Sequence, residues 1–98
     1  MRVDEREIFR KALQEYGIMS QKMMVIEECA ELTNAIAKMA RGRVGVDDII
    51  TELADVSIMV DQMAIFFGED KFNAERTRKV QRLNERLLKC TVKQNEVK

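Results

Sequence analysis

The 98-residue chain contains no histidine, no proline and no tryptophan, and it has only four glycines and two cysteines. Without histidine, the chain cannot build a histidine-ligated metal centre, a Ser-His triad or acid–base catalysis by imidazole. The few glycines and the missing prolines nearly exclude a β-sandwich or β-barrel, because those folds need many turns. Cys29 and Cys90 form no CxxC motif, so we expect no zinc or redox site and two reduced thiols that are buried or idle.

The chain also lacks an excess of charge of either sign and lacks a long apolar segment. It has 17 basic and 17 acidic residues, whereas a partner made of nucleic acid requires a basic excess. No apolar run approaches the roughly 18 residues that a membrane span needs, and no apolar stretch follows the charged N-terminal residues as in a signal peptide. We therefore expect a cytoplasmic protein with no nucleic-acid polymer and no membrane among its partners.

What the chain does have is helical periodicity, with 46% hydrophobic and 35% charged residues. Apolar residues recur every three or four positions in four segments, which predicts helices over about 4–16, 20–41, 47–67 and 70–89. Ser20 is the predicted N-cap of the second helix. Because short links between amphipathic helices favour antiparallel neighbours, we predict an all-α fold, an antiparallel four-helix bundle. It is predicted to form one domain over residues 1–98, with a frayed tail over about 91–98.

The second and third predicted helices are more apolar than a small isolated bundle requires. In the second helix, the main stripe is predicted to include Val25, Cys29 and Leu32. Second faces of the two helices carry further apolar residues, namely Met23, Ile26, Ile50, Ile58 and Ile65. Because exposed apolar faces are unfavourable in water, we expect these faces to be buried between subunits. The core would then be completed in a homodimer or a homotetramer.

Two pairs of acidic residues interrupt these apolar helices. Glu28 and Glu31 are three residues apart on the second helix, and Glu52 and Asp55 are three apart on the third, so each pair shares one helix face. If antiparallel packing brings the pairs together, their repulsion and desolvation are costly, and a hard divalent cation offsets that cost. An all-carboxylate ligand set favours Mg²⁺, with Mn²⁺ as a substitute, over iron.

The alternative is that each acidic pair lies on a solvated or salt-bridged face, because acidic pairs are common on helices. Lys22, Lys38 and Arg41 are close enough in the sequence to neutralise such a face. Either pair taken singly favours this alternative, and the presence of both pairs favours the metal site.

The fourth predicted helix supplies the opposite charge. Lys79 and Arg82 are three residues apart and share a face. Such residues can hold phosphate oxygens, lysine as a point charge and arginine as a planar fork. For each residue, a solvated helix surface remains the alternative.

The acidic pairs also resemble a known motif. Glu28-Cys29-Ala30-Glu31, then 20 intervening residues, then Glu52-Leu53-Ala54-Asp55 resembles the ExxE…ExxD motif of the MazG-like all-α nucleoside triphosphate pyrophosphohydrolases. The doubled acid Glu27-Glu28 is also typical of that family, and the resemblance extends over about 20–67.

The resemblance implies a Mg²⁺-dependent hydrolysis of a nucleoside or deoxynucleoside triphosphate between its α- and β-phosphates. The products would be the monophosphate and pyrophosphate, and the role would be nucleotide-pool clean-up. Family members are usually dimers or tetramers, and they differ widely in the base they accept. By the same resemblance, the metal ligands would be Glu28, Glu31, Glu52 and Asp55.

Further roles follow if this chemistry applies. Glu27 or Glu31 is the candidate for orienting or deprotonating the attacking water. Lys79 and Arg82 are the candidates for stabilising charge on the pyrophosphate leaving group. The competing hypothesis is a non-catalytic helical oligomerisation or interaction module, in which the acids only solubilise the surface.

Overall fold

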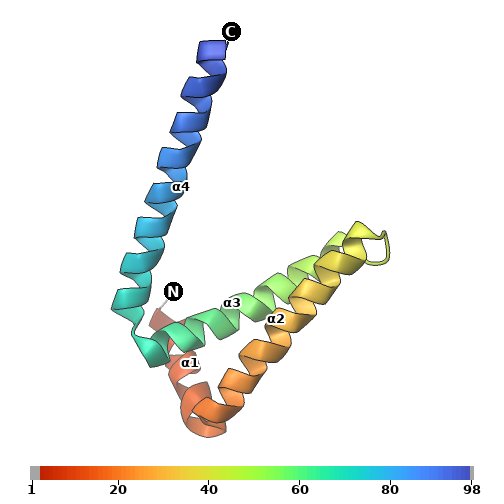
Figure 1. Cartoon of the computed structure of the whole chain (residues 1–98). Coiled ribbons are helices and arrows are strands. Elements are labelled where there is room, and N and C mark those ends of the chain that lie inside the picture. The colour runs from red at the N-terminus through yellow and green to blue at the C-terminus, as the bar shows by residue number, and fades with distance from the viewer. Residues whose placement is uncertain (1–2, 98) are drawn as a thin grey trace. The chain divides into compact units, whose positions relative to one another are not determined.

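The computed structural model describes the backbone of residues 3–97 and the side chains of residues 4–91. Within that range the chain forms four helices and no strand: α1 (Val3–Tyr16), α2 (Ile18–Ala40), α3 (Val46–Phe67) and α4 (Glu69–Val97) (Figure 1). The fold is therefore all-α, as the sequence predicts.

Gly17 separates α1 from α2 by a single residue. Its N–H donates to the Leu13 carbonyl at 3.0 Å and closes α1, while its carbonyl accepts from the Gln21 N–H at 3.1 Å and opens α2. The φ of Gly17 is 83°, which glycine adopts without strain. The N-cap of α2 is thus Gly17, and the prediction that Ser20 begins this helix is wrong. A glycine that ends one helix can begin the next, and the sequence pattern did not reveal this.

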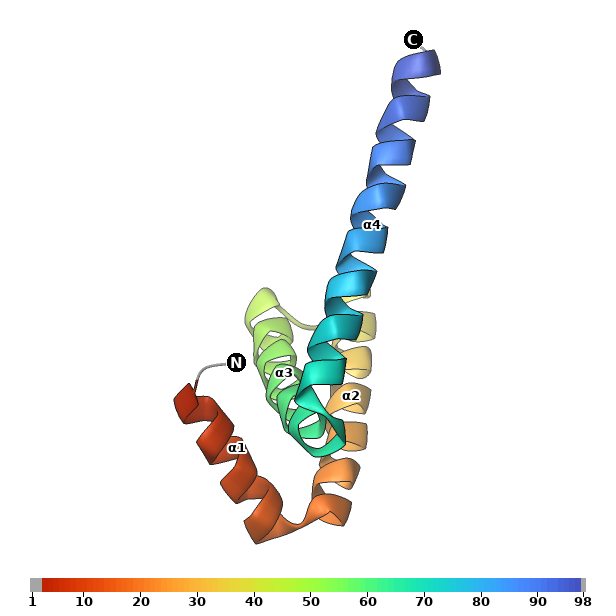
Figure 2. The same ribbon diagram turned by 90° about the vertical axis from the view of Figure 1, so that its left-hand side faces the viewer.

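A short connection joins α2 to α3. Gly42 has a φ of 73° and donates its N–H to the Met39 carbonyl at 2.9 Å, which ends α2. The Asp48 carboxylate accepts the Gly45 N–H at 3.1 Å, just before α3. This tight turn makes α2 and α3 antiparallel, and they lie side by side in both views (Figures 1 and 2).

The chain divides after Phe67 into two units, which are α1–α3 and α4. In the first unit, α1 packs against both α2 and α3. The second unit is one helix that continues to Val97, past Lys89, where the sequence predicted its end. The assembly of the four helices into one bundle and one domain stays a prediction.

The core of the first unit lies where α1 meets the start of α2 and the second half of α3. Phe9, Met59 and Ala64 are its buried apolar residues, and two glutamines, Gln21 and Gln62, are buried with them. Burial along α2 differs from the predicted stripe because Glu28 is half-buried beside Val25 and Leu32. Cys29 is exposed instead, as is Cys90, so neither thiol is buried.

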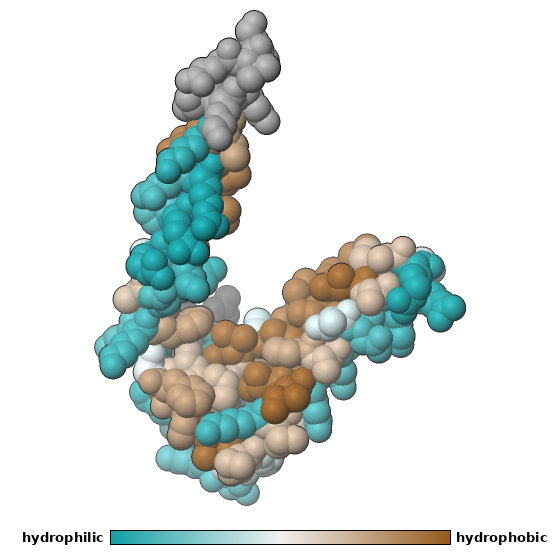
Figure 3. Space-filling view, viewed as in Figure 1, coloured by the Kyte–Doolittle hydropathy of each residue, from teal (hydrophilic) through white to brown (hydrophobic). Residues whose placement is uncertain are grey.

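Large apolar side chains remain on the surface of α2 and α3. Met23, Ile26, Ile50 and Ile58 are 54%, 61%, 56% and 43% exposed. Figure 3 shows apolar surface along the α2–α3 pair. Among the described residues, no helix combines the length and the apolar character that crossing a membrane requires.

Candidate metal-binding site

Three of the predicted acids meet between α2 and α3. One carboxylate oxygen from each of Glu28, Glu31 and Glu52 lies within 4.8 Å of the other two. The spacing of three residues places Glu28 and Glu31 on one face of α2, and the antiparallel partner helix brings the Glu52 carboxylate close to both. We call these three side chains the carboxylate cluster.

The fourth predicted ligand, Asp55, lies beside the cluster. Its carboxylate is not within the 4.8 Å group. Its negative charge nevertheless contributes to raising the pKa of both Glu28 and Glu52. Asp55 is half-buried one turn along α3 from Glu52, so it forms the edge of the cluster.

Two oxygens of the cluster are buried and unpaired. The Oε2 atoms of Glu28 and Glu52 are shielded from solvent and accept no hydrogen bond within the described structure. Buried carboxylate oxygens without a partner are costly, because desolvation removes the hydrogen bonds that water supplies. Both atoms therefore have unused capacity to accept a hydrogen bond or a cation.

The same environment raises the pKa of two members of the cluster. The pKa of Glu28 is raised first by burial and then by the negative charges of Glu31, Asp55 and Glu52. The pKa of Glu52 is raised by burial and then by the charges of Glu31 and Asp55, with a smaller contribution from Asp48. Like charges and low hydration both disfavour the ionised form.

No basic side chain among the described residues of the first unit neutralises the cluster. Among the described residues of α1–α3, no lysine or arginine forms an ion pair with Glu28, Glu31 or Glu52. The Nζ atom of Lys22 instead lies over the rings of Phe66 and Phe67, at 5.6 and 5.5 Å from their centroids. The salt-bridged alternative therefore has no supporting ion pair among the described residues of this unit.

The donor set fits a hard divalent cation. All the donors are carboxylate oxygens, which Mg²⁺ and Mn²⁺ prefer. On an octahedral Mg²⁺ ion, trans oxygens lie about 4.2 Å apart and cis oxygens about 3 Å apart. The three oxygens, which lie within 4.8 Å of one another, would therefore move closer together on binding one ion. Glu31 is exposed while Glu28 and Glu52 are half-buried, so the cluster has an open side.

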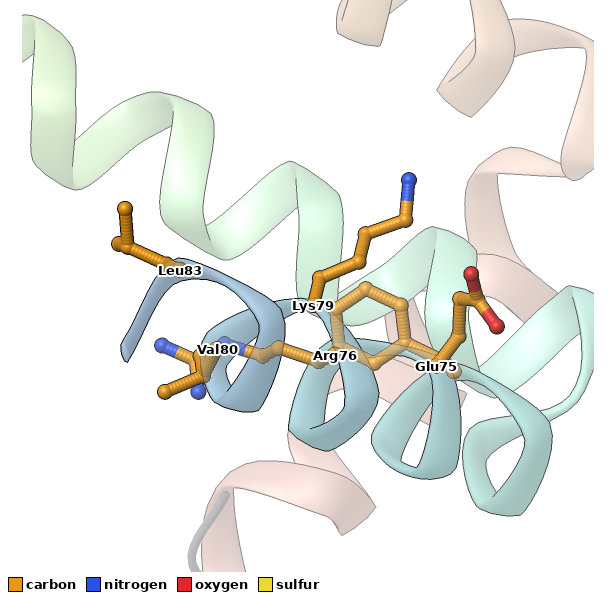
Figure 4. Close-up of a pocket in the computed structure, with 6 residues that line it drawn as sticks. Glu75, Arg76, Lys79, Val80 and Leu83 are labelled. Atoms are coloured by element: carbon orange, nitrogen blue, oxygen red, sulfur yellow. The ribbon is translucent and has the colours of Figure 1, made fainter. Parts of the chain in front are cut away.

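The other predicted site residues lie outside the cluster. Glu27 is exposed on α2, about 100° around the helix from Glu28. Lys79 lines an open apolar groove on α4 (Figure 4), and Arg82 lines a neighbouring hollow of the same helix. Because α4 is a separate unit, the convergence of Lys79 and Arg82 on the cluster stays a prediction.

One buried polar contact, two helical turns away from the cluster, was not predicted. Gln21 on α2 and Gln62 on α3 form a hydrogen bond at 2.7 Å. The signal was present in the sequence, because Gln21 precedes Glu28 by seven residues and Gln62 follows Asp55 by seven. Two helical turns separate the members of each pair, so each glutamine shares a face with an acid.

Comparison of the chain with models of known protein families, with curated proteins and with solved structures finds no match. The resemblance to the MazG-like family therefore rests on the two acidic motifs and their spacing alone.

Proposed function

We propose that the protein is a Mg²⁺-dependent nucleoside triphosphate pyrophosphohydrolase of the MazG-like kind. It would convert a nucleoside or deoxynucleoside triphosphate and water into the monophosphate and pyrophosphate, in nucleotide-pool clean-up in the cytoplasm. The observation that carries this proposal is the carboxylate cluster itself, with two buried oxygens that nothing in the described structure pairs. The motif spacing supports the choice of reaction.

The burial of each acid indicates its role, with the half-buried acids suited to bind the metal and the exposed acids suited to accept a proton. Bound Mg²⁺ would supply neutralisation of the triphosphate charge and a more acidic water. Glu28 and Glu52, with their buried oxygens, are suited to hold the ion, together with Asp55 at the edge. Glu31 is exposed and can both complete the ligand set and accept a proton from the attacking water, while exposed Glu27 is the alternative base.

The reaction is tested with a panel of nucleoside and deoxynucleoside triphosphates in Mg²⁺. We expect at least one substrate to give equal amounts of monophosphate and pyrophosphate, because cleavage falls between the α- and β-phosphates. An excess of EDTA should abolish turnover, and added Mn²⁺ should restore it. Orthophosphate and a diphosphate as the first products would contradict the assignment.

The basic residues of α4 give a second test. Lys79 and Arg82 are exposed, and neither forms an ion pair or hydrogen bond among the described residues. If they hold phosphate, Lys79→Ala and Arg82→Ala should each lower kcat/KM, while changing stability by less than about 0.5 kcal/mol, as for other surface substitutions. Lys89→Ala, farther along the same helix, is the control. Unchanged steady-state kinetics in both variants would show that Lys79 and Arg82 do not bind the substrate.

Assembly forms part of the proposal. The exposed apolar side chains of α2 and α3, which include Met23, Ile26 and Ile50, would be covered between subunits of a homodimer or homotetramer. We expect light scattering to give two or four times the 11.4 kDa chain mass. Substitution of Ile26 and Ile50 by glutamate should shift the mass towards the monomer. A wild-type monomer at high micromolar concentration would contradict the assembly.

The same exposed apolar surface favours one other candidate, a non-catalytic helical interaction module. In that case the cluster would have no ligand, and millimolar Mg²⁺ would leave the melting temperature unchanged. A cation that binds only the native state must raise the melting temperature, so a thermal shift separates the two candidates.

A further inference from the structure

The buried glutamine pair holds α2 and α3 together inside an apolar core. Gln21 donates from Nε2 to Oε1 of Gln62 at 2.7 Å, and both residues are only 5% exposed. Nε2 of Gln62 is directed at the Met59 sulfur at 3.8 Å, which keeps the Gln62 oxygen turned towards Gln21. The pair lies at the end of α2 and α3 that α1 covers.

The glutamine pair and the acids lie in one register of α2 against α3. In a pair of antiparallel helices, moving a number of residues forward along one helix corresponds to moving the same number of residues backward along the other. Seven residues forward from Gln21 is Glu28, and seven backward from Gln62 is Asp55. Three further steps on each helix reach Glu31 and Glu52. A register that places Gln21 opposite Gln62 therefore also places Glu28 opposite Asp55 and Glu31 opposite Glu52.

This register is opposed by the charges that it brings together. The acids of α2 and α3 repel one another, because carboxylate oxygens of Glu28, Glu31 and Glu52 lie within 4.8 Å of one another. Sliding one helix past the other, or splaying the two apart, would relieve that repulsion. The buried residues around the glutamine pair include Met59. Methionine adapts to more than one packing arrangement, so it does little to fix the register of the two helices. A slide would, however, leave both glutamine amides unpaired away from water, where unpaired polar groups are strongly disfavoured.

We propose that Gln21 and Gln62 are positioning residues for the carboxylate cluster. Their hydrogen bond sets the register of α2 against α3 and thereby holds the four acids where a divalent cation binds. This inference rests on the proposed function, because it assigns the register a purpose in metal binding. A pair that only fills the core would leave the metal site unchanged when replaced by apolar residues of similar size.

The test separates register from stability. Gln62→Leu leaves the Gln21 amide unpaired, so its melting temperature should fall. The double variant Gln21→Leu/Gln62→Leu removes both amides, so its melting temperature should recover, because replacing both partners can be nearly neutral. Its Mn²⁺ affinity, measured by electron paramagnetic resonance, should nevertheless stay at least about tenfold below wild type, in line with the loss of residues that orient metal ligands.

Two further variants control for general damage. Phe9→Leu loosens the same core through α1 without touching the hydrogen bond, and it should keep the wild-type Mn²⁺ affinity despite a lower melting temperature. Gln62→Asn keeps an amide that is one methylene too short to reach Gln21. It should weaken Mn²⁺ binding, and it serves as the test should the double variant fail to fold.

A distance measurement in the metal-free protein reports the register directly. Spin labels are placed on the exposed Cys29 of α2 and on Ser57→Cys of α3, which is also exposed, with Cys90→Ser to remove the second native thiol. Dilution with unlabelled protein removes contributions between subunits. We expect a narrow distance distribution with the glutamine pair present and a broad or shifted distribution in the double variant.

The outcomes distinguish this inference from the proposed function. Wild-type Mn²⁺ affinity in a folded double variant, or in Gln62→Asn, overturns the positioning role. An unchanged label distance in the double variant overturns it as well. If the wild-type protein binds no Mn²⁺, the proposed function fails, and the label distances alone then decide whether the glutamine pair sets the register.

Discussion

Glu52→Gln should stabilise the metal-free protein and remove most of its activity. Glutamine keeps the shape of the side chain and removes the negative charge that burial and the charges of Glu31 and Asp55 disfavour, as they raise the pKa of Glu52. The melting temperature without metal should therefore rise. Turnover should fall at least about a hundredfold, because a hard cation loses a charged ligand and affinity or activity falls steeply when metal sites are perturbed.

Glu15→Gln is the matched control for this prediction. Glu15 is an exposed acid of α1 outside the cluster, so its replacement should change neither the metal-free melting temperature nor turnover. A salt-bridged face predicts the opposite pattern for Glu52→Gln, with lower stability and full turnover. That pattern would show that Glu52 has no role in catalysis.

The metal-free protein should become more stable as the pH falls from neutral towards about 5. The pKa values of Glu28 and Glu52 are raised in the folded state. Between the usual glutamate pKa and these raised values, the folded state binds more protons than the unfolded state. The free energy of unfolding therefore falls as pH rises through this window. Glu75 has the opposite effect, because its hydrogen bond with Arg78 lowers its pKa, but that stabilisation is lost only below the usual glutamate range.

Saturating Mg²⁺ should reverse this pH dependence. Protons compete with the cation for the same oxygens, so the melting temperature in Mg²⁺ should fall on acidification. The double variant Glu28→Gln/Glu52→Gln should lose most of the pH dependence in the metal-free state. Thermal melts at several pH values, with and without Mg²⁺, test these expectations. A metal-free melting temperature that falls steadily from neutral pH to about 5 would contradict them.

The number and approximate bounds of the helices were predictable because glycines lie between them. Gly17, Gly42 and Gly68 have positive φ and lie at helix ends. The start of α2 was missed because Ser20 is a good N-cap by residue type, whereas Gly17 caps by backbone conformation alone. The end of α4 was missed because a polar sequence without glycine or proline contains no stop signal.

The candidate site was predictable in its residues but not in its neighbours. A spacing of three placed each acidic pair on one face, and antiparallel connection brought three of the acids together. The pattern could not show that Lys22 lies over Phe66 and Phe67, because that contact depends on tertiary packing between α2 and α3. The apolar periodicity also did not predict that Glu28 is half-buried and Cys29 exposed. Neighbouring residues on a helix point about 100° apart, so an error of one residue in the predicted stripe changes which side chain is buried.

Binding of Mn²⁺ to the metal-free protein, followed by electron paramagnetic resonance, shows whether the carboxylate cluster holds a divalent cation. We expect saturable binding to the wild-type protein, competition by Mg²⁺, loss of binding in Glu52→Gln and retention in Glu15→Gln. The reason is that Glu52 supplies a buried, unpaired oxygen to the carboxylate cluster and Glu15 does not. Equal Mn²⁺ binding by wild type and Glu52→Gln, or no saturable binding by either, would contradict a metal site at the carboxylate cluster.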